Sequence, residues 1–373
     1  MKQITVGELK ERLEKGDPMS IVDIREADEF SDWHIHGSRN LPVYDALRAG
    51  EERALVDGAA TLAAGRPIVT ICRRGIVSRR AAELLGSLGF DAVSLEGGIR
   101  GWSGVWSEAR VPLRSAPAAT LVQIRRNGKG CLSYLLGSAG EAAVFDPSVD
   151  ATVYTGIAAA EGLRIERVVE THVHADHLSR ARDLCRITGA TLTLPRNDRV
   201  TFEHAAVRDG EELAVGDLRI RVVATPGHTG ESVCYLVGQD ALLTGDTLFV
   251  DAVGRPDLEE GDTGARNAAH TLHDSLKRAI LGQFGGDVLV CPAHHGSGIG
   301  FDGEAIVAGL GDLGTRLAIL GRAEDEFVKT VLASLGAKPP NFETIIAINE
   351  GKVPLADLDP LDVEAGPNRC AAG

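Results

Sequence analysis

The sequence predicts an α/β protein built from two domains, and three observations support this. Its 373 residues exceed what one domain usually holds, since domains contain roughly 100–200 residues. Two expected strands, the apolar run at 68–71 and the segment at 165–170, are each followed by a segment expected to be helical. The composition is globular, with 44% hydrophobic and 25% charged residues, which excludes disorder, collagen and coiled coil for the chain as a whole.

Charge and cysteine content narrow the partners and the compartment. The chain has 39 basic and 53 acidic residues, which argues against nucleic acid or an anionic membrane surface as a partner. Six cysteines are too few for a disulfide scaffold, so free thiols are expected. No signal peptide is visible, and no apolar stretch reaches the roughly 18 residues of a membrane span. We therefore expect a soluble, cytoplasmic protein.

A change in charge marks an expected boundary near residue 110. Residues 1–110 hold 15 basic and 17 acidic side chains, whereas residues 111–373 hold 24 and 36. The stretch Val111–Thr120 (VPLRSAPAAT) contains proline and alanine without a clear period. We expect a first domain at 1–110, a linker at 111–119 and a second domain at 120–373.

The first domain is expected to open with a short helix. Thr5 followed by Glu8 is a capping-box pattern ahead of an amphipathic segment. Residues 20–24 (SIVDI) predict a buried strand, and the run at 68–71 predicts another. The helical spacing at 78–88 then predicts a helix that follows the second strand after a tight loop.

That loop, at 72–77 (CRRGIV), places a cysteine between a strand and a helix. Inward-pointing backbone N–H groups with a helix N-terminus behind them form a cradle that binds anions. The same dipoles stabilise the thiolate of Cys72, which makes it a candidate nucleophile. The alternative is an inert, buried cysteine at a strand end; Gly75 and the helix start at Ser78 favour the reactive thiol.

These segments resemble a single rhodanese domain, a sulfurtransferase module. The resemblance covers about residues 1–110 and rests on VDIREADEF (22–30), HIHGSRNLP (34–42), the CRRGIVS loop and LEGGIRGW (95–102). It implies that Cys72 accepts a sulfane sulfur as a persulfide and passes it on. It also implies that the loop residues contact the substrate: Arg73, Arg74, Gly75 and Val77.

One position departs from the family pattern. Many single rhodanese domains have arginine at the position of Val77, where it helps to hold the sulfur donor. Use of thiosulfate therefore does not follow from the resemblance, although Arg73, Arg74 or Arg79 could replace that arginine. His34 and His36 in the second motif are expected to be structural.

A dense group of potential metal ligands follows the strand expected at 165–170. His172 and His174 in THVHADH are two residues apart, so an extended chain puts both on one side. Asp176 and His177 follow as the chain turns into a helix expected at 178–189. Imidazole and carboxylate groups bind zinc, iron or manganese, so we favour a metal site over a structural histidine patch.

Three further segments each place a histidine or aspartate at the end of a short strand. His228 lies in ATPGHTGES, Asp246 in ALLTGDTLF and His294 in VLVCPAHHG, where His295 is the fallback. Strand ends that carry such residues beside glycine or proline deliver ligands to one cleft.

This order of motifs resembles the metallo-β-lactamase fold over about residues 120–350. The predicted fold class is therefore α/β, with an N-terminal rhodanese-like α/β domain and a C-terminal αββα sandwich. The resemblance implies two metal sites with Asp246 between them, one formed by His172, His174 and His228, and the other by Asp176, His177 and His294.

Two branches of this fold carry the same seven residues. Glyoxalase II-like enzymes hydrolyse glutathione thioesters at a dinuclear site, for which two zinc ions are the alternative cofactor. Persulfide dioxygenases hold one Fe(II), and the residues that correspond to His172, His228 and Asp246 bind it. Two histidines and a carboxylate form the facial triad of non-haem iron oxygenases. The remaining residues then surround the iron without binding it: His174, Asp176, His177 and His294.

Further segments favour the dioxygenase branch. TGDTLFVDAVGRPDL (244–258) and KPPNFETIIAINEG (338–351) resemble that branch, including bacterial members fused to rhodanese domains. A thioester hydrolase gains nothing obvious from a sulfurtransferase neighbour. We expect oxidation of glutathione persulfide by O₂ to sulfite and glutathione, with sulfane-sulfur transfer at Cys72, in hydrogen sulfide and thiosulfate metabolism. The runner-up is a glyoxalase II-like hydrolase, and a third reading is a sulfur carrier or redox sensor with an inactive metal domain.

A few residues and properties stay open at this point. Arg255, nine residues after Asp246, is a candidate for holding a glutathione carboxylate, against an equally strong alternative of an ion pair with Asp257. The cysteines other than Cys72 are expected to be small buried residues or, at the end of the chain, a tail residue: Cys131, Cys185, Cys234, Cys291 and Cys370. The oligomeric state is undecided, with a homodimer among the alternatives.

Overall fold

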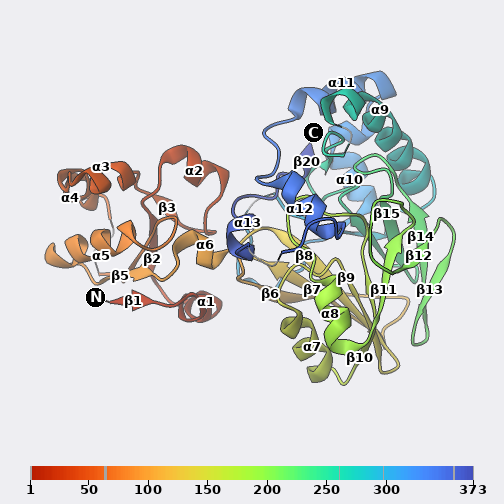
Figure 1. Cartoon of the computed structure of the whole chain (residues 1–373), viewed down its shortest axis with the longest axis horizontal. Coiled ribbons are helices and arrows are strands. Elements are labelled where there is room, and N and C mark those ends of the chain that lie inside the picture. The colour runs from red at the N-terminus through yellow and green to blue at the C-terminus, as the bar shows by residue number, and fades with distance from the viewer. Residues whose placement is uncertain (1, 63–64, 260, 297, 356–357, 373) are drawn as a thin grey trace.

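The computed structural model describes residues 2–62, 65–259, 261–296, 298–355 and 358–372. Figure 1 shows two domains side by side, the first in red and orange and the second in yellow to blue. The α/β fold class predicted from the sequence is confirmed. Within the described residues, no helix has both the length and the apolar character needed to cross a bilayer.

The first domain is a five-stranded parallel sheet with helices on both faces. The strand order is β1-β5-β4-β2-β3. The strands are β1 (Gln3–Ile4), β2 (Ser20–Asp23), β3 (Arg39–Asn40), β4 (Ile68–Ile71) and β5 (Ala92–Leu95). The helices are α1 (Val6–Glu14), α2 (Ala27–Asp32), α3 (Tyr44–Ala49), α4 (Arg53–Ala59), α5 (Val77–Ser87) and α6 (Gly98–Trp102).

Alternation along β4 explains why both faces of this sheet are covered. Ile68 packs with the apolar residues of α3, α4 and α5, whereas Val69 packs with those of α1 and α6. The predicted capping box is present at the start of α1, where the Glu8 N–H donates to Thr5 Oγ1 at 3.2 Å and the Thr5 N–H donates to Glu8 Oε2 at 2.8 Å.

The second domain stacks two mixed sheets. The larger has the order β12-β11-β10-β9-β8-β7-β6 and the smaller the order β13-β14-β15-β16-β18-β19. The larger sheet contains β6 (Ser107–Val111), β7 (Thr120–Arg126), β8 (Cys131–Ser138), β9 (Glu141–Phe145), β10 (Arg164–Val169), β11 (Thr191–Pro195) and β12 (Ala205–Val207). The smaller contains β13 (Glu212–Val215), β14 (Leu218–Ala224), β15 (Val233–Val237), β16 (Ala241–Gly245), β18 (Leu289–Pro292) and β19 (Ala308–Gly309).

Three apolar clusters show that this domain has four layers. Tyr134 of β8 and Tyr235 of β15 meet in the core between the sheets. The next residue of β8, Leu135, faces α7 (Ala151–Ala160) and α8 (Ala181–Thr188) on the outer side of the larger sheet. On the outer side of the smaller sheet lie α9 (Gly261–Asp274), a π-helical turn (Ser275–Leu281), α10 (Leu310–Arg316), a 3₁₀ turn (Ala318–Gly321) and α11 (Glu324–Ser334). The expected αββα sandwich is therefore present.

The strand β6 moves the boundary between the domains. Its residues Ser107–Val111 pair antiparallel with β7, so they belong to the sheet of the second domain. The sequence placed residues 107–110 in the first domain and began a linker at 111. Alternate residues of β6 are buried, which shows why this stretch pairs as an edge strand instead of remaining an open linker.

The C-terminal segment returns across the second domain to the first. It contains α12 (Phe342–Asn349), α13 (Pro360–Val363) and β20 (Ala371–Ala372), which pairs with β17 (Val253–Gly254). Figure 1 shows α13 beside α6, at the junction of the domains. There Arg100 forms ion pairs with Asp359 and Asp362.

Candidate metal centre and thiol site

The candidate metal ligands come from loops that follow strands of both sheets. The loop after β10 carries His172, His174, Asp176 and His177, and the loops after β14, β16 and β18 carry His228, Asp246 and His294. Each of these seven side chains is at most 2% exposed. The structure therefore brings together all of the histidines and aspartates that the motifs singled out, in a site closed to bulk water.

His172, His228 and Asp246 form one compact donor set. Asp246 Oδ2 lies 3.7 Å from His172 Nε2 and 3.5 Å from His228 Nε2. These three atoms are buried and have no hydrogen-bond partner among the described residues. Ligand atoms about 2.1 Å from a shared ion lie about 3.4 Å apart in tetrahedral geometry. The set therefore fits a metal ion with two nitrogen donors and one oxygen donor.

Hydrogen bonds fix the Nδ1 atoms of the two histidines, which point away from the donor set. His228 Nδ1 lies 2.8 Å from the Arg255 carbonyl oxygen, so this nitrogen carries the proton and Nε2 presents a lone pair. His172 Nδ1 contacts Thr171 Oγ1 at 2.9 Å, and that hydroxyl contacts Asp146 Oδ2 at 2.9 Å. Burial and the neighbouring His174 ring hold the pKa of His172 well below its usual range, which keeps the ring neutral.

His174 lies outside this set. Its Nε2 lies 3.2 Å from Asp146 Oδ1 and 3.1 Å from Glu170 Oε2, and the three side chains form a buried cluster of their own. Burial lowers the pKa of His174, but these two carboxylates outweigh it and raise the pKa well above its usual range. His174 Nδ1 has no described partner.

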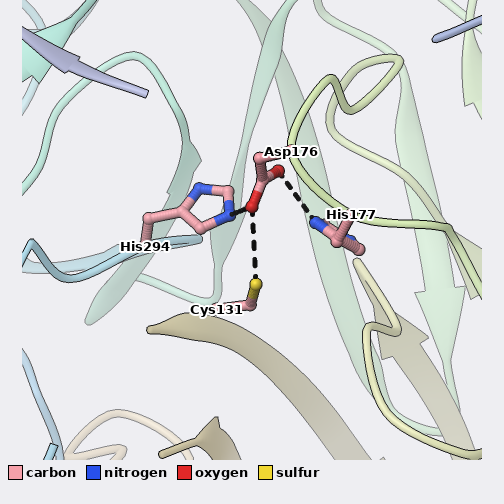
Figure 2. A group of neighbouring side chains, drawn as sticks. All are labelled: Cys131, Asp176, His177 and His294. Carbon is pink, nitrogen blue, oxygen red and sulfur yellow. Dashed lines mark hydrogen bonds and ion pairs between the residues drawn. The ribbon is translucent and has the colours of Figure 1, made fainter. Parts of the chain in front are cut away.

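Asp176, His177 and His294 form a second cluster, and Cys131 completes it (Figure 2). Asp176 Oδ1 lies 2.9 Å from His177 Nδ1, and Asp176 Oδ2 lies 2.8 Å from His294 Nε2, without hydrogen-bond geometry in the second case. The Cys131 thiol donates to Asp176 Oδ2 at 3.5 Å. His294 Nδ1 donates to Asp246 Oδ1 at 2.6 Å, which joins the two clusters.

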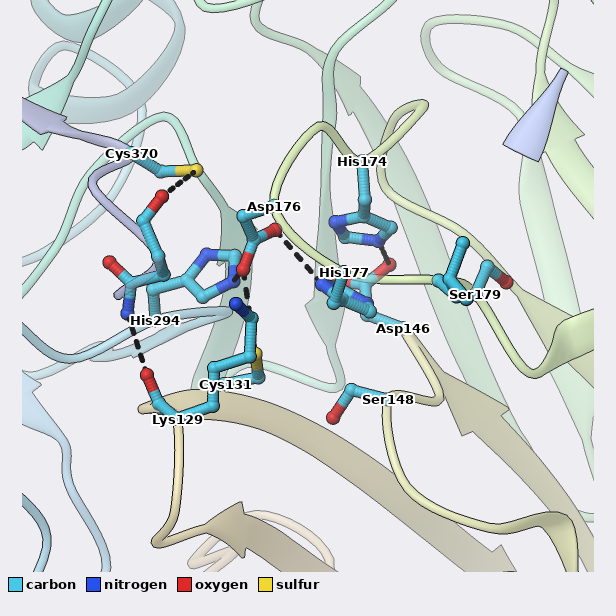
Figure 3. A network of polar contacts seen from close by, with 12 residues as sticks. Lys129, Cys131, Asp146, Ser148, His174, Asp176, His177, Ser179, His294 and Cys370 are labelled. Atoms are coloured by element: carbon cyan, nitrogen blue, oxygen red, sulfur yellow. Dashed lines mark hydrogen bonds and ion pairs between the residues drawn. The ribbon is translucent and has the colours of Figure 1, made fainter. Parts of the chain in front are cut away.

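Two thiols of this centre were missed from the sequence, which predicted a small buried residue at Cys131 and a tail residue at Cys370. Burial and Asp176 raise the pKa of Cys131, but the His177 and His294 rings outweigh them and lower it to about 7. Cys370 approaches Asp246 and His294 from the C-terminal segment, and its thiol donates to the Asn368 carbonyl oxygen at 3.6 Å (Figure 3). Neither cysteine lies in a sequence motif. Only the fold brings β8 and the C-terminal segment beside the candidate metal ligands, so the sequence carried no signal for them.

Two sequence alternatives at this centre are resolved by position. His294 lies in the cluster, whereas the His295 side chain is directed to the outer side, 4.0 Å from Asp251. Arg255 is buried and donates from Nε and Nη2 to Asp257, and from Nη1 and Nη2 to the backbone carbonyls of residues 336, 337 and 369. These bonds use its five N–H groups, so the geometry supports the ion pair with Asp257 and leaves no donor for a substrate carboxylate.

The thiol of Cys72 lies where the strand β4 meets α5. The Ser78 backbone N–H and hydroxyl donate to Cys72 Sγ at 3.4 and 3.2 Å. The N-terminal turn of α6 holds the loop from behind, because the Ile99 N–H donates to the Cys72 carbonyl oxygen at 2.9 Å. Cys72 itself is 2% exposed, at the base of a loop whose Arg73 and Arg74 are exposed.

The substrate residues expected in this loop have partners of their own. Arg73 donates to both oxygens of Glu29 at 2.6 Å and stacks over the Tyr44 ring, and Arg74 pairs with Asp362 of α13 at 3.0 Å. Gly75 has a φ of 78° in a position where a side chain would meet the Leu95 carbonyl oxygen. Val77 is the first residue of α5.

Two cavities lie between the domains. One, of about 500 Å³, is lined by Arg73 and Arg74 of the Cys72 loop and by residues 362 and 365–367 of the C-terminal segment. The other, of about 460 Å³, is lined by Lys129, His295 and residues 367–369, which neighbour the metal centre in sequence. Asp32, Trp33 and Pro367 line both cavities and form the wall between them.

Family profiles divide the chain in the same way as its fold. The profile of the rhodanese-like domain matches residues 5–104, and that of the metallo-beta-lactamase superfamily matches residues 126–294. The solved structures that superpose on the chain include two with a TM-score above 0.5. A metallo-beta-lactamase from Staphylococcus aureus is 25% identical with a TM-score of 0.58, over 64% of this chain and 74% of that one. ETHE1 from Myxococcus xanthus is 28% identical with a TM-score of 0.54, over 62% of this chain and 99% of that one.

The sequence relatives share a glutathione-related name. A hydroxyacylglutathione hydrolase from Anaeromyxobacter dehalogenans is 40% identical over 126 residues, which are 34% of this chain and 49% of that protein. One from Francisella tularensis subsp. novicida is 32% identical over 163 residues, which are 43% of this chain and 61% of that protein. The chain spans about half the length of the first two relatives, at 49% and 51%.

Proposed function

We propose that this chain, which joins a rhodanese-like domain to a metallo-β-lactamase fold, is a persulfide dioxygenase with a sulfurtransferase domain. The second domain oxidises glutathione persulfide with O₂ at one Fe(II) held by His172, His228 and Asp246. With one water consumed, the products are glutathione and sulfite, so the terminal sulfur loses four electrons and O₂ gains them. Glutathione as the thiol is supported by the relatives named hydroxyacylglutathione hydrolase.

One observation carries this proposal. His172, His228 and Asp246 present three partnerless donor atoms within 4.8 Å of one another, and His174 does not belong to that group, since its Nε2 contacts Asp146 and Glu170. Two histidines and one carboxylate leave open positions on an iron ion, which suits a reaction that must bind two further molecules. A three-histidine site would need His174 in the same group.

When bound, Fe(II) supplies a common point for the persulfide sulfur and O₂ and the capacity for electron transfer. The residues of the chain keep the ligands in the right charge state and tautomer and exclude water. Asp246 is held ionised, since the His294 ring lowers the pKa of its carboxyl although burial opposes this. The Arg255 carbonyl and Thr171 hydroxyl keep the two ligand rings in the tautomer that presents Nε2. Phe249, Leu258 and Ala175 pack beside the centre and exclude water.

In the first domain, Cys72 carries sulfane sulfur as a persulfide. Transfer to glutathione forms the new S–S bond as the bond to Cys72 Sγ breaks, and it regenerates the thiol. In the reverse use, Cys72 takes the sulfur from glutathione persulfide and releases glutathione. Sulfite then takes the sulfur from Cys72 and leaves as thiosulfate, which again regenerates the thiol. Donation from Ser78 to Cys72 Sγ stabilises the thiolate that both directions need.

The second candidate is a dinuclear zinc hydrolase of glutathione thioesters. It is favoured by the hydroxyacylglutathione hydrolase relatives and by the second donor cluster beside the first. The two proposals differ in metal content, co-substrate and product, so a single set of assays separates them.

The test is oxygen uptake with glutathione persulfide by protein loaded anaerobically with Fe(II). We expect uptake with sulfite as product in the native chain and in a His204→Ala control, whose ring lies away from the centre and bonds the Phe202 carbonyl. His228→Ala should abolish both. Absence of uptake in the native chain, with about two zinc ions bound and a glutathione thioester hydrolysed, would establish the second candidate instead.

A further inference from the structure

Arg199 is the point where three acidic side chains of the second domain meet. Its Nε donates to Glu350 Oε1 at 2.7 Å. Its Nη1 donates to Glu259 Oε1 at 2.7 Å and to Glu231 Oε2 at 3.2 Å. The Arg199 side chain is 18% exposed, and that of Glu231 only 3%. One guanidinium therefore serves as the counter-ion of several carboxylates at once.

The loop after β11 places this arginine beside the candidate metal ligands. The strands β10 and β11 are parallel neighbours, so the loops that follow them leave the same edge of the larger sheet. The loop after β10 carries His172. In the loop after β11, Asn197 Oδ1 accepts from the backbone N–H groups of Arg199 at 3.0 Å and Val200 at 3.1 Å. This asparagine turn holds Arg199 next to the ligand loop.

Glu231 connects the two loops that carry the histidines of the donor set. It lies on the loop after β14, which also carries His228, and its Oε1 accepts from the Val173 N–H at 3.0 Å. Val173 directly follows His172 in the chain. A carboxylate as buried as that of Glu231 needs a counter-ion to remain charged in this place, and Arg199 supplies it.

Glu259 provides a second connection to the loop of His228. Its Oε2 accepts from the Gly230 N–H at 2.6 Å, while its Oε1 pairs with Arg199. Gly230, Glu259 and His228 also line one cavity of about 130 Å³. Through two carboxylates, the guanidinium of Arg199 is therefore linked to the backbone beside both histidines of the donor set.

Binding of a substrate carboxylate is the other role that an arginine near a metal centre could have. The surrounding charge opposes it here. Three carboxylates carry negative charge, against the positive charges of Arg199 and of Lys352, whose Nζ lies 2.8 Å from Glu350 Oε2. A further anion would meet an excess of negative charge, so this arginine is suited to hold the loops and not to bind substrate.

We propose that Arg199 is a positioning residue of the metal centre, which sets the separation of the loops that carry His172 and His228. Without the guanidinium, the Glu231 carboxylate loses its counter-ion and turns toward water, so it no longer holds the loop of His172. The two Nε2 atoms then lose the spacing that one ion needs. This inference deepens the proposed function and rests on it only in that the donor set binds a metal ion.

Metal affinity tests this role. The Fe(II) affinity is measured anaerobically by competition with a chromophoric chelator, and the unfolding temperature is measured on metal-free protein. Arg199→Ala should bind Fe(II) about 10-fold more weakly, because loss of an outer partner of a ligand costs about 10–100-fold. Guanidinium ion added at low concentration should restore the affinity, since it can occupy the place of the missing side chain.

Arg125→Ala is the control for a merely structural effect. Arg125 is buried and donates to Asp302 Oδ1 at 2.5 Å and to the Glu304 carbonyl oxygen at 2.6 Å, and among the described residues none of its bonds reaches a ligand loop. This variant should lose stability and keep the native Fe(II) affinity. An equal loss of affinity in both variants would overturn the proposal.

Arg199→Lys keeps the outcome decisive if Arg199→Ala does not fold. Lysine retains the positive charge beside the carboxylates but lacks the planar fork that reaches partners from two edges. Its Fe(II) affinity should therefore lie below that of the native chain. Native affinity in Arg199→Lys or in Arg199→Ala, or a weak affinity of Arg199→Ala that guanidinium does not restore, contradicts the positioning role.

Oxygen uptake and Zn²⁺ affinity of the same samples separate this inference from the proposed function. A native chain that prefers Zn²⁺ and shows no uptake defeats the dioxygenase, while the effect of Arg199→Ala on Zn²⁺ affinity still decides the positioning role. Uptake by the native chain together with equal Fe(II) affinities of the native chain and Arg199→Ala defeats the positioning role alone.

Discussion

Thr171 connects a buried carboxylate to a candidate metal ligand. Its hydroxyl donates to Asp146 and accepts from His172 Nδ1, so it fixes both the tautomer and the rotation of the ring. Asp146 holds this hydroxyl from a strained position, with a φ of 50° that is uncommon outside glycine. The residue next to the ligand therefore determines how the ligand presents Nε2.

Replacing Thr171 with valine should weaken metal binding. Valine keeps the shape but removes the hydrogen bond to His172, and loss of such an outer partner costs about 10–100-fold in metal affinity. Competition with a chromophoric chelator measures the change. Thr193→Val is the matched control, because Thr193 is equally buried and its hydroxyl has no described partner. Equal affinities for the two variants would contradict the role of Thr171.

Cys72 should act independently of the metal centre. Cys72→Ser removes the only atom that can carry sulfane sulfur in its loop, so sulfur transfer from a persulfide donor should disappear. Oxygen uptake by the iron-loaded variant should stay close to native, and so should both activities of Cys185→Ser. Loss of uptake together with transfer would mean that the two domains are not independent catalysts.

At the scale of elements, the glycine at the start of α6 decides whether this helix can pack against the Cys72 loop. Gly98 has a φ of 60°, and a Cβ built there lies 2.2 Å from the Cys72 carbonyl oxygen and 2.7 Å from the Gly75 nitrogen. Both contacts are backbone atoms, which cannot move aside as a flexible side chain can. The motif LEGGIRGW therefore has glycine here because α6 must pack directly against the loop.

Gly98→Ala should destabilise the first domain and impair sulfur transfer. The strained φ alone costs about 1–3 kcal/mol, and the backbone clash adds to it. Gly86→Ala is the contrasting variant, because Gly86 lies inside α5 with no atom within 4 Å of a built Cβ, and alanine there should stabilise by about 0.5–1 kcal/mol. Thermal unfolding and sulfur-transfer assays of both variants check this; equal transition temperatures would refute it.

Predictions of elements succeeded where the signal was local. The capping box at Thr5 and the strand–loop–helix around Cys72 rest on neighbouring residues, and both are present. The strand β6 was missed because its alternation of small or apolar with charged residues covers only five positions, and only the pairing with β7 identifies it as a strand.

At the scale of the whole molecule, Glu364 joins three distant parts of the second domain. Its carboxylate accepts from Arg126 at 2.9 and 3.3 Å, from Arg180 at 2.8 Å and from the Leu178 N–H at 2.9 Å. Burial raises the pKa of Glu364, but Arg126 and Arg180 outweigh it and lower the pKa to about 2. The C-terminal segment is thereby fixed against β7 and the loop that carries four of the candidate metal ligands.

Glu364→Gln should destabilise the protein strongly. It leaves the guanidinium groups of Arg126 and Arg180 without their counter-ion in a buried site, which costs about 3–5 kcal/mol. Urea unfolding of the intact chain, followed by circular dichroism, measures the loss. Glu343→Gln on the exposed face of α12 is the control and should change stability by less than about 0.5 kcal/mol. Similar effects of the two variants would rule out this role.

The Glu364 carboxylate should make the free energy of unfolding depend on pH, with stability falling as the pH is lowered. Because the pKa of Glu364 is lower in the folded protein, at about 2, its stabilisation is complete above the unfolded carboxyl pKa of about 4.3 and is lost as pH falls toward 2. The difference in unfolding free energy between the native chain and Glu364→Gln should therefore be constant from pH 7 to about 5 and shrink below. A difference that stays constant down to pH 3 would contradict this.

The sequence by itself determined the two domain folds, the strand-end positions of Cys72 and of the candidate metal ligands, and the choice of seven candidate ligands. These features rest on short motifs and local periodicity, which survive in a single chain without its fold. Only the tertiary structure shows which of the seven lie together. His172, His228 and Asp246 form one group, Asp176, His177 and His294 form a second, and His174 lies with Asp146 and Glu170. The tertiary structure also places Cys131 beside Asp176 and pairs Arg255 with Asp257. The local sequence cannot show the first contact, because its two residues come from separate segments of the chain.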